Sequence, residues 1–409
     1  MIPSLTSSKS LNMPDPSSKI RVGHVITRFH GAGGAKNTIL TCAGLDKSRF
    51  EVDLIVGASA DEWRAEGAGV NWIQIPSMVR LLHPVKDVLA ARSLKRLFQE
   101  KQYHIVHTHL GKAGILGRWA AHQARVPIII HGLHGGTFNP TQNALENAFY
   151  RWVEKKAMAW TDKVISVGED LVQRYLDAGI GSPEDYVIIH SGMDLSAFRQ
   201  AATMTEAERI AKKQELGLPA DAFVAGYIAA LEWRKGHHHL IEMMKKLAPQ
   251  HPHLHLVFAG EGFSEQRLRD LVARAGLNER IHFLGYRNDV PEIMGMLDVK
   301  LFVSEREGLP QVLVQADTVG RPILAFEVEG LREVVRDGFN GFIFRQGDVD
   351  GLSRALVRFI QNPKLAREMG QNGQSLVDER WDIATMQRKT QELYEELLKS
   401  PPRANQSEE

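Results

Sequence analysis

The chain has 409 residues, 43% of them hydrophobic, which exceeds what one compact core usually supports, so we expect two domains. The 50 Lys and Arg residues are balanced by 49 Asp and Glu residues. Without a basic excess to neutralise phosphates, nucleic acid is excluded as the principal partner. The single cysteine, Cys42, cannot form an internal disulfide, which suits a reducing cytosol.

The two ends of the chain are expected to be unstructured. Residues 1–19 are rich in Ser, Pro and Lys and lack the apolar core of a signal peptide, which predicts a disordered leader, and we expect a disordered tail over 401–409. No apolar run approaches the roughly twenty residues that a membrane span needs. We expect a cytoplasmic protein that at most lies against the inner face of a membrane.

In the first half, short β-branched runs alternate with amphipathic stretches. The runs predict strands over residues 21–27, 52–56, 70–75, 105–108, 127–131, 163–167 and 186–189. Such alternation predicts a parallel sheet covered by helices on both faces, with ligands at the carboxyl ends of the strands.

The alternation stops over residues 196–221, which are polar, and then restarts. It predicts strands over 223–229, 254–259, 281–284, 299–303 and 322–326, and helices that begin near Gly236, Ser264, Val290, Pro310, Leu331 and Val349. We therefore expect an α/β protein of two doubly wound, Rossmann-like domains. The expected divisions are an N-terminal domain over 20–195, a linker over 196–221, a C-terminal domain over 222–375, and an amphipathic helix over 376–400 that can cross back to the N-terminal domain.

The most informative ligand-site candidate follows the strand over 299–303. Gly308 permits a backbone conformation that other residues avoid, and Pro310 fits the first turn of a helix running to about Val319. The free N–H groups of that turn would face an anion beyond the strand. Glu307 stands at the edge of this site, with Gln315 two helical turns further on. The alternative is an ordinary strand, turn and helix with an exposed glutamate.

A glycine-rich turn from Arg28 to Lys36 follows the first strand, where Gly33 and Gly34 would let a ligand approach the backbone closely. The turn lacks the glycine spacing of the dinucleotide fingerprint and the Gly-Lys-Ser/Thr ending of a P-loop. No acidic residue closes the next strand to bind a ribose, so a nicotinamide dehydrogenase is disfavoured.

Histidines gather at two strand ends of the first half: His107 with His109, and His131 with His134. An imidazole there can donate to a sugar hydroxyl or to a developing oxyanion, and His134, beside two glycines, is the best candidate. The alternative is polar side chains satisfied by neighbouring backbone. We expect no metal site, because no cysteine or carboxylate lies at a familiar ligand spacing from these histidines. We expect the run 237–239, three histidines, to form a mostly solvated helix face.

Arg234 and Lys235 lie at a helix start after the first strand of the second half, where cations could neutralise a diphosphate leaving group. The alternative is a surface pair in a loop. Asp348 and Asp350 have the spacing of a metal-binding pair, but they open a helix whose first turn favours acids in any case.

Together these segments resemble the retaining glycosyltransferases of family 4, whose GT-B fold has two Rossmann-like domains facing across a cleft. The resemblance extends from about Lys19 to Leu398. Its second-half motifs are Ser304-Glu-Arg-Glu-Gly-Leu-Pro310, Gly320-Arg-Pro322, Gly330-Leu-Arg-Glu-Val-Val335, Asp337-Gly-Phe-Asn-Gly341 and Gly347-Asp348. The first half adds the glycine turn, His107-Thr-His109, the stretch from His131 to Gly136, Ile165-Ser-Val-Gly-Glu169 and Ser191-Gly-Met-Asp194.

The resemblance implies a nucleotide-sugar donor held by the second domain and a glycan, lipid-linked or small-molecule acceptor held mainly by the first. Glu307 would contact the donor sugar, Gly308 and Leu309 would offer backbone N–H groups, and Lys235 would bind the diphosphate. His134 would lie near the reacting sugar, and Glu169 would support the cleft from the first domain. The implied reaction is a front-face displacement that needs no protein nucleophile, no cofactor and no metal.

Three positions depart from the family pattern. Gln315 stands where the family has a second acid that binds both ribose hydroxyls, and an amide offers only one acceptor oxygen. Ala230 replaces a common arginine, whose place Arg234 could take. Ser191 replaces a frequent asparagine before Gly192.

Two alternatives to an active transferase follow. One is a degenerate GT-B protein that binds nucleotide or glycan without turnover, and the other is a nucleotide-sugar epimerase. The stretch from Pro84 to Lys101 mixes basic and apolar residues and could lie on an anionic membrane. A surface helix with ordinary basic decoration is the alternative there.

Overall fold

The computed structural model describes residues 18–28, 33–58, 69–138 and 142–399. Nearly all of the expected leader, the whole expected tail and part of the glycine-rich turn lie outside these residues. The chain divides into two compact units, the first made of Met1–Gly192 with Ile383–Glu409 and the second of Met193–Asp382. None of the described helices is both long enough and apolar enough to cross a membrane.

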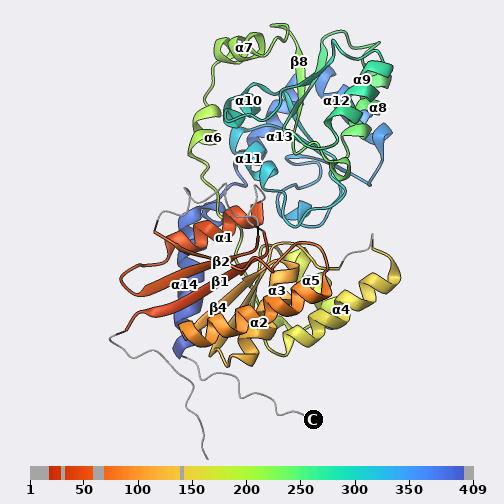
Figure 1. The fold of residues 1–409 in the computed structure, drawn as a ribbon. Helices are drawn as coiled ribbons and strands as arrows, with labels where there is room; N and C mark the ends of the chain where they lie inside the picture. Colours follow the sequence, from red (N-terminus) through yellow and green to blue (C-terminus); the bar gives the residue numbers. More distant parts are fainter. Residues whose placement is uncertain (1–17, 29–32, 59–68, 139–141, 400–409) are drawn as a thin grey trace, which may run out of the picture. The chain divides into compact units, whose positions relative to one another are not determined.

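The first unit contains a seven-stranded parallel sheet with helices on both faces (Figure 1). Its strand order is β3-β2-β1-β4-β5-β6-β7. The strands are β1 (Ile20–Ile26), β2 (Phe50–Val56), β3 (Asn71–Gln74), β4 (Ile105–His109), β5 (Ile128–Leu133), β6 (Lys163–Ser166) and β7 (Tyr186–Ile188). The helices are α1 (Gly33–Gly44), α2 (Pro84–Lys101), α3 (Gly111–Gln123), α4 (Ala144–Met158), α5 (Glu169–Asp177) and α14 (Ile383–Lys399), with the 3-10 turn η1 (Pro183–Asp185).

Side chains of the central strands point alternately to the two faces of the sheet, and each face is covered by its own helices. Val25 packs with α2 and α3, whereas Val22 and Ile26 pack on the other face with α14 and α1. Since successive strand residues point to opposite faces, His24 lies on the α1 and α14 face. Ile105 belongs to that face too. The same alternation therefore places the two histidines of β4 under α14.

Helix α14 is part of the first unit although it ends the described chain. Met386, Leu393 and Tyr394 repeat at helical spacing and join the same apolar cluster as the β-strands. Two hydrogen bonds add to this packing: Gln387 Nε2 donates to the Leu40 carbonyl at 2.8 Å, and Asn37 Nδ2 lies 3.1 Å from Met386 Sδ. The last helix therefore brings side chains to the sheet built by the first half of the chain.

The second unit contains a six-stranded parallel sheet in the order β10-β9-β8-β11-β12-β13. The strands are β8 (Phe223–Ile228), β9 (Leu254–Ala259), β10 (Ile281–Phe283), β11 (Val299–Phe302), β12 (Ile323–Phe326) and β13 (Gly341–Phe344). The helices are α6 (Ser196–Ala201), α7 (Glu206–Glu215), α8 (His237–Leu247), α9 (Glu265–Arg274), α10 (Val290–Met296), α11 (Gln311–Val319), α12 (Val349–Gln361) and α13 (Pro363–Gln374), with the 3-10 turns η2 (Trp233–Lys235), η3 (Leu331–Glu333) and η4 (Glu379–Trp381).

The second unit differs from the sequence expectations in three places. The range expected as a linker, 196–221, holds α6 and α7, and the unit includes both. Strand β13 was not predicted, because it is a short edge strand with mostly half-buried side chains and little alternation. The helix predicted near Leu331 is only the turn η3: the Asn340 side chain donates to the Val334 carbonyl at 3.0 Å and accepts from the Arg336 amide at 2.7 Å, which ends the helix.

Each sheet has one place where the strand order reverses, between β1 and β4 in the first unit and between β8 and β11 in the second. Open α/β sheets bind ligands at the carboxyl ends of the strands at such reversals. Both groups of candidate residues follow strands of these two pairs or their direct neighbour β5, so the fold of each unit places its candidates where a ligand binds.

Candidate active site

In the second unit, two loops at the β8 and β11 ends are joined by backbone contacts. The Glu305 amide donates to the Arg234 carbonyl at 2.9 Å, which joins the two loops, and Tyr227 Oη of β8 donates to the Lys235 carbonyl at 2.5 Å, which holds the first loop on its strand. Gly236 has φ 75° and a Cβ there would collide with the Val303 carbonyl oxygen, so only glycine allows this approach. The loops therefore form one rigid support.

Lys235 and Glu307 meet across these two loops. Lys235 Nζ lies 2.6 Å from Glu307 Oε1, and the side chains are 16% and 19% exposed. The pair places a positive charge and a carboxylate side by side at the strand ends, both still reachable by a ligand. The ammonium can bind an anionic group, and the carboxylate can accept hydrogen bonds from hydroxyls.

Arg234 lies beside this pair but has a different partner. Its Nε donates to Glu232 Oε2 at 2.7 Å, and its side chain is 42% exposed. Ala230 is exposed at the end of the same strand region. The bond to Glu232 uses only the Nε–H of Arg234, so its other guanidinium N–H groups can donate to an anion.

The turn at Gly308 and Leu309 leads into α11. Among the described residues the amides of these two residues donate no backbone hydrogen bond, so they remain available to a ligand. Gly330 packs so closely on the Gly308 carbonyl that a Cβ would collide with it, which fixes the turn from behind. Gln315 is half-buried on α11.

A buried lysine lies beneath this region, and sequence reasoning missed it. Lys300 is fully buried in β11, where its Nζ donates to the Leu301 carbonyl at 2.9 Å and lies 5.0 Å from the Tyr227 ring centroid. Burial, with a smaller contribution from the Lys235 charge, lowers the pKa of Lys300 to about 7. In the sequence, only its position inside the apolar run 299–303 could have indicated that this lysine is buried.

The expectation of a solvated histidine face over 237–239 is wrong. His237 is buried against Tyr227 and Phe258, and burial lowers its pKa to about 3. His238 stacks on Trp233 with ring centroids 4.5 Å apart. The reason is the tight turn at Gly236, which turns the first residues of α8 inward.

In the first unit, His134 follows β5 directly and lies against the start of α1. The position that a Cβ on Gly34 would take is 3.5 Å from the His134 Cβ, whereas Gly33 is exposed at the first position of the helix. His134 Nε2 lies 3.0 Å from His109 Nδ1, and burial lowers the pKa of His134 to about 4. His134 is therefore neutral at physiological pH.

The loop after His134 is held by a buried ion pair. Thr137 Oγ1 donates to Glu154 Oε1 at 2.8 Å, and Arg118 donates to Glu154 Oε2 at 2.6 Å, with both charged side chains 1% exposed. Such support fixes the main chain that positions His134. His131 has a different environment: its Nδ1 lies 3.0 Å from Thr108 Oγ1, and its ring lies close to Gly114 of α3.

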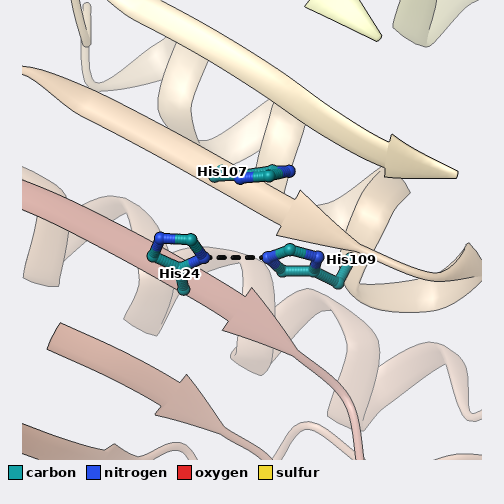
Figure 2. A group of neighbouring side chains, drawn as sticks. All are labelled: His24, His107 and His109. Atoms are coloured by element: carbon teal, nitrogen blue, oxygen red, sulfur yellow. Dashed lines mark hydrogen bonds between the residues drawn. The ribbon is translucent and has the colours of Figure 1, made fainter. Parts of the chain in front are cut away.

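His107 and His109 point with His24 into one buried cluster (Figure 2), whose ring nitrogens lie within 4.8 Å of one another. His24 was not a candidate from the sequence, because only the pairing of β1 with β4 places it opposite His107.

The other acidic candidates have structural roles or positions of their own. Asp348 caps α12 by accepting from the Gly351 amide at 2.7 Å, and Asp350 pairs with Lys246 at 2.5 Å. Glu169 opens α5.

Two parallel α/β units with these strand-end residues define the GT-B class, as predicted. Known proteins agree: residues 33–192 match "Glycosyl transferase 4-like domain" and residues 208–376 match "Glycosyl transferases group 1". The chain belongs to this glycosyltransferase family. It is an enzyme that transfers a sugar from a nucleotide-sugar donor, which confirms the predicted class.

Individual relatives cover most of the chain. An Escherichia coli UDP-Gal:alpha-D-GlcNAc-diphosphoundecaprenol alpha-1,3-galactosyltransferase is 27% identical over 94% of this chain and 99% of its own. A putative glycosyltransferase, EpsD of Bacillus subtilis (strain 168), is 34% identical over 70% of this chain and 75% of its own. Among solved structures, Anabaena Alr3699/HepE in complex with UDP and glucose is similar with a TM-score of 0.77 and 22% identity, covering 92% of this chain and 99% of that one.

The buried ammonium of Lys300 leads to a prediction about stability. The folded pKa of about 7 lies below the ordinary lysine pKa of 10.5, so the folded state binds fewer protons than the unfolded state between these pH values. Stability should therefore rise with pH through this window and be lowest at and below pH 7. We expect Lys300→Met to raise the free energy of unfolding at pH 7 by roughly 1–4 kcal/mol.

Urea unfolding at pH 6, 7, 8 and 9 checks this expectation, with Lys245→Met, an exposed lysine on α8, as the control. The gain from Lys300→Met should shrink as the pH rises. A gain that is absent, or equal at all four pH values, contradicts the prediction.

Proposed function

We propose that the donor is a uridine diphosphate sugar and that the acceptor is a lipid-linked saccharide reached at the inner face of a membrane. The observation that carries the donor part is the Lys235–Glu307 pair at the β8 and β11 ends. The Anabaena protein bound UDP and glucose, and the Escherichia coli relative is named for a diphosphoundecaprenol-linked acceptor. Both names support the choice of these substrate classes.

On this proposal the donor diphosphate takes Glu307's place as the partner of Lys235. The amides of Gly308 and Leu309 add two hydrogen bonds, and the guanidinium of Arg234 adds a second cation. Glu307, released from the ammonium, accepts from hydroxyls of the donor sugar. After this exchange the Glu307 carboxylate is still hydrogen-bonded, now to hydroxyl donors, and Lys235 still faces a negative charge.

The reaction follows as a front-face displacement. The acceptor oxygen forms the new glycosidic bond on the face from which the diphosphate leaves, while the bond between the anomeric carbon and the phosphate oxygen breaks. The acceptor proton passes to the departing oxygen, so no protein nucleophile, metal or cofactor is required. Lys235 and the backbone amides stabilise the negative charge that grows on the diphosphate, and Glu307 and His134 hold the sugar.

The acceptor part is supported by exposed apolar side chains of the first unit. On α2, Val85, Val88 and Leu89 are 65%, 51% and 48% exposed, and Leu81 and Leu82 just before the helix are more exposed still. On α4, the exposed apolar residues are Leu145, Phe149 and Trp152.

The first turns of α2 and α4, which carry Val85 and Leu145, lie at the carboxyl edge of the sheet, where His134 follows β5. Both helices run from the carboxyl end of one strand back to the start of another, so their first turns lie at that edge. Lysines and arginines of α2 would add attraction to anionic lipids. We propose this surface as a peripheral membrane contact.

Lys235→Ala tests the donor site. Loss of the ammonium should lower kcat/KM for sugar transfer by roughly 100-fold or more, because the charge growing on the diphosphate loses its cation. Lys246→Ala is the control, since Lys246 also pairs with a carboxylate but on the outer part of α8. Transfer rates with a panel of UDP-sugars give the readout. Unchanged transfer by Lys235→Ala would reject its role, and no turnover of any nucleotide sugar by the wild type would favour the degenerate alternative.

Gln315→Glu tests the ribose contact. A carboxylate accepts from both ribose hydroxyls, so we expect UDP to bind about tenfold more tightly, in the range of one additional charge-assisted hydrogen bond. Isothermal titration calorimetry with UDP measures this, and Gln371→Glu, an exposed change of the same charge on α13, is the control. Equal affinities of Gln315→Glu and wild type would show that Gln315 is a neutral replacement.

The membrane contact is tested by a Leu82→Ser, Val85→Ser, Val88→Ser triple variant. We expect its binding to vesicles containing anionic lipid to fall about tenfold or more, because about 0.8 kcal/mol is lost for each methylene no longer buried. Hydrolysis of the donor in solution should be unchanged. Tyr286→Ser with Phe339→Ser, exposed aromatics of the second unit, serves as the control. Vesicle co-sedimentation equal to that of wild type would reject this surface.

A further inference from the structure

A chain of hydrogen bonds joins helix α14 to His134 through the core of the first unit. Tyr394 Oη lies 2.6 Å from His107 Nδ1 and 3.3 Å from His24 Nε2. His24 Nδ1 lies 2.9 Å from His109 Nε2 (Figure 2), and His109 Nδ1 lies 3.0 Å from His134 Nε2. Tyr394, His24, His107 and His109 are at most 3% exposed, so water does not interrupt the chain.

All members of this chain are neutral near pH 7. Burial lowers the pKa of His24 to about 3, lowers the pKa values of His107 and His109 well below 6.5, and raises the pKa of Tyr394 well above 10.0. A neutral imidazole donates from one nitrogen and accepts at the other. Each hydrogen bond therefore fixes the direction of the next. Only two proton orders satisfy every bond of the chain, and they run in opposite directions.

The distances at Tyr394 select one of the two orders. An O–H donor makes short hydrogen bonds of about 2.7 Å, whereas N–H donors prefer about 2.9 Å or more. The 2.6 Å separation suits the phenol donating to His107 Nδ1, and the 3.3 Å separation suits His24 Nε2–H donating to the phenol oxygen. His24 Nδ1 must then accept from His109 Nε2–H. His109 Nδ1 in turn must accept from His134 Nε2–H.

We propose that Tyr394, His24 and His109 fix His134 as its Nε2–H tautomer, so that His134 Nδ1 accepts a hydrogen bond from a hydroxyl group of the donor sugar. The identity of that ligand rests on the proposed function. Among the described residues, His134 Nδ1 is a buried nitrogen without a partner, as expected of an acceptor kept for a ligand. His134 is then an acceptor, not the donor suggested by its sequence position. Tyr394, His24 and His109 are positioning residues.

The other end of the chain fits the same order. His107 Nε2 must carry the proton, and it too has no partner among the described residues. It lines a small pocket together with His109, His134 and Gly132, where an oxygen atom could accept from it. A Cβ on Gly132 would lie 2.7 Å from His109 Nδ1 and 3.1 Å from His134 Nε2, so glycine at this position leaves the chain its room.

The cluster of His24, His107 and His109 could also suggest a metal site, but the arrangement of these rings argues against one. The rings of His24 and His109 are nearly parallel, at 11°, and joined nitrogen to nitrogen at 2.9 Å. Two zinc ligands at about 2.0–2.1 Å from one ion at tetrahedral angles would stand further apart, with lone pairs aimed at the ion and not at each other. The separation and the ring arrangement are those of a hydrogen bond.

Nitrogen NMR of the ligand-free protein tests the tautomer directly. In full-length protein labelled with ¹⁵N-histidine, long-range ¹H–¹⁵N spectra distinguish a protonated from an unprotonated ring nitrogen, and His134→Phe assigns the His134 signals. We expect His134 with Nε2 protonated and Nδ1 unprotonated. Tyr394→Phe removes the donor to His107 and the acceptor of His24, so His134 should become a mixture of both tautomers.

Tyr103→Phe is the matched control, because it removes another buried phenol of the first unit, one that donates to Asp53 Oδ2 at 2.5 Å. It should leave the His134 signals unchanged. His134 protonated at Nδ1 in the wild type, or equal His134 spectra in Tyr394→Phe and wild type, would overturn the proposal. If Tyr394→Phe does not fold, His109→Phe breaks the chain one step from His134 and carries the same expectation.

Binding measurements separate positioning from general loss of structure. In Tyr394→Phe, the dissociation constant for a UDP-sugar should rise about fivefold to tenfold, and that for UDP, which lacks the sugar hydroxyls, should stay unchanged. An equal loss for both ligands would mean a structural role only and would overturn the proposal. If no UDP-sugar binds at all, the proposed function fails, whereas the tautomer in the ligand-free protein still decides the hydrogen-bond chain.

Metal analysis completes the test. Purified protein should contain no stoichiometric metal at this cluster, and added Zn²⁺ followed by EDTA should leave the spectra of His24 and His109 as they were. A bound ion whose removal shifts these signals would show a metal site and overturn the proposal.

Discussion

Parallel pairing at the centre of each sheet is the constraint on which the rest of the structure depends. In the first unit it sets His24 opposite His107 and Ile26 opposite His109, and in the second it sets Lys300 of β11 beside Gly226 of β8. A shift by one residue would turn each of these side chains to the opposite face of its sheet. Register therefore decides which polar groups are buried together and which loops meet above them.

Both units bury titratable groups in a neutral or weakly charged state below their ligand sites. In the first unit the buried histidines remain unprotonated, and in the second the pKa of Lys300 falls to about 7. Charged groups occur as pairs, either fully buried, as Arg118 with Glu154, or partly exposed, as Lys235 with Glu307. Of these pairs, the partly exposed one can exchange a partner for a ligand, whereas breaking the buried one would leave an uncompensated buried charge.

The sequence predicted what local patterns control. Twelve of the strands lie close to their predicted ranges, because buried parallel strands carry continuous apolar runs. Glu307 and Lys235 were found from their places after such runs, and the structure brings them together at 2.6 Å. The sequence could not show that His24 and Tyr394 share hydrogen bonds, since they lie 370 residues apart. Lys300 was missed although it stands inside an apolar run, and His237 was missed because its burial depends on the turn before α8, which no periodicity records.

Helix α14 belongs to the core of the first unit, although the residues of the second unit separate it in sequence from the other elements of that core. Its apolar face packs on the sheet, and its Tyr394 links His107 to the histidines that lead to His134. A helix that served only for packing could fill this position with phenylalanine, which has almost the same shape. The phenol adds a group that both donates and accepts, and it does so where the two histidine branches meet. On the proposal above, α14 therefore does more than pack on the sheet. Its Tyr394 hydroxyl determines which ring nitrogen of each linked histidine carries the proton.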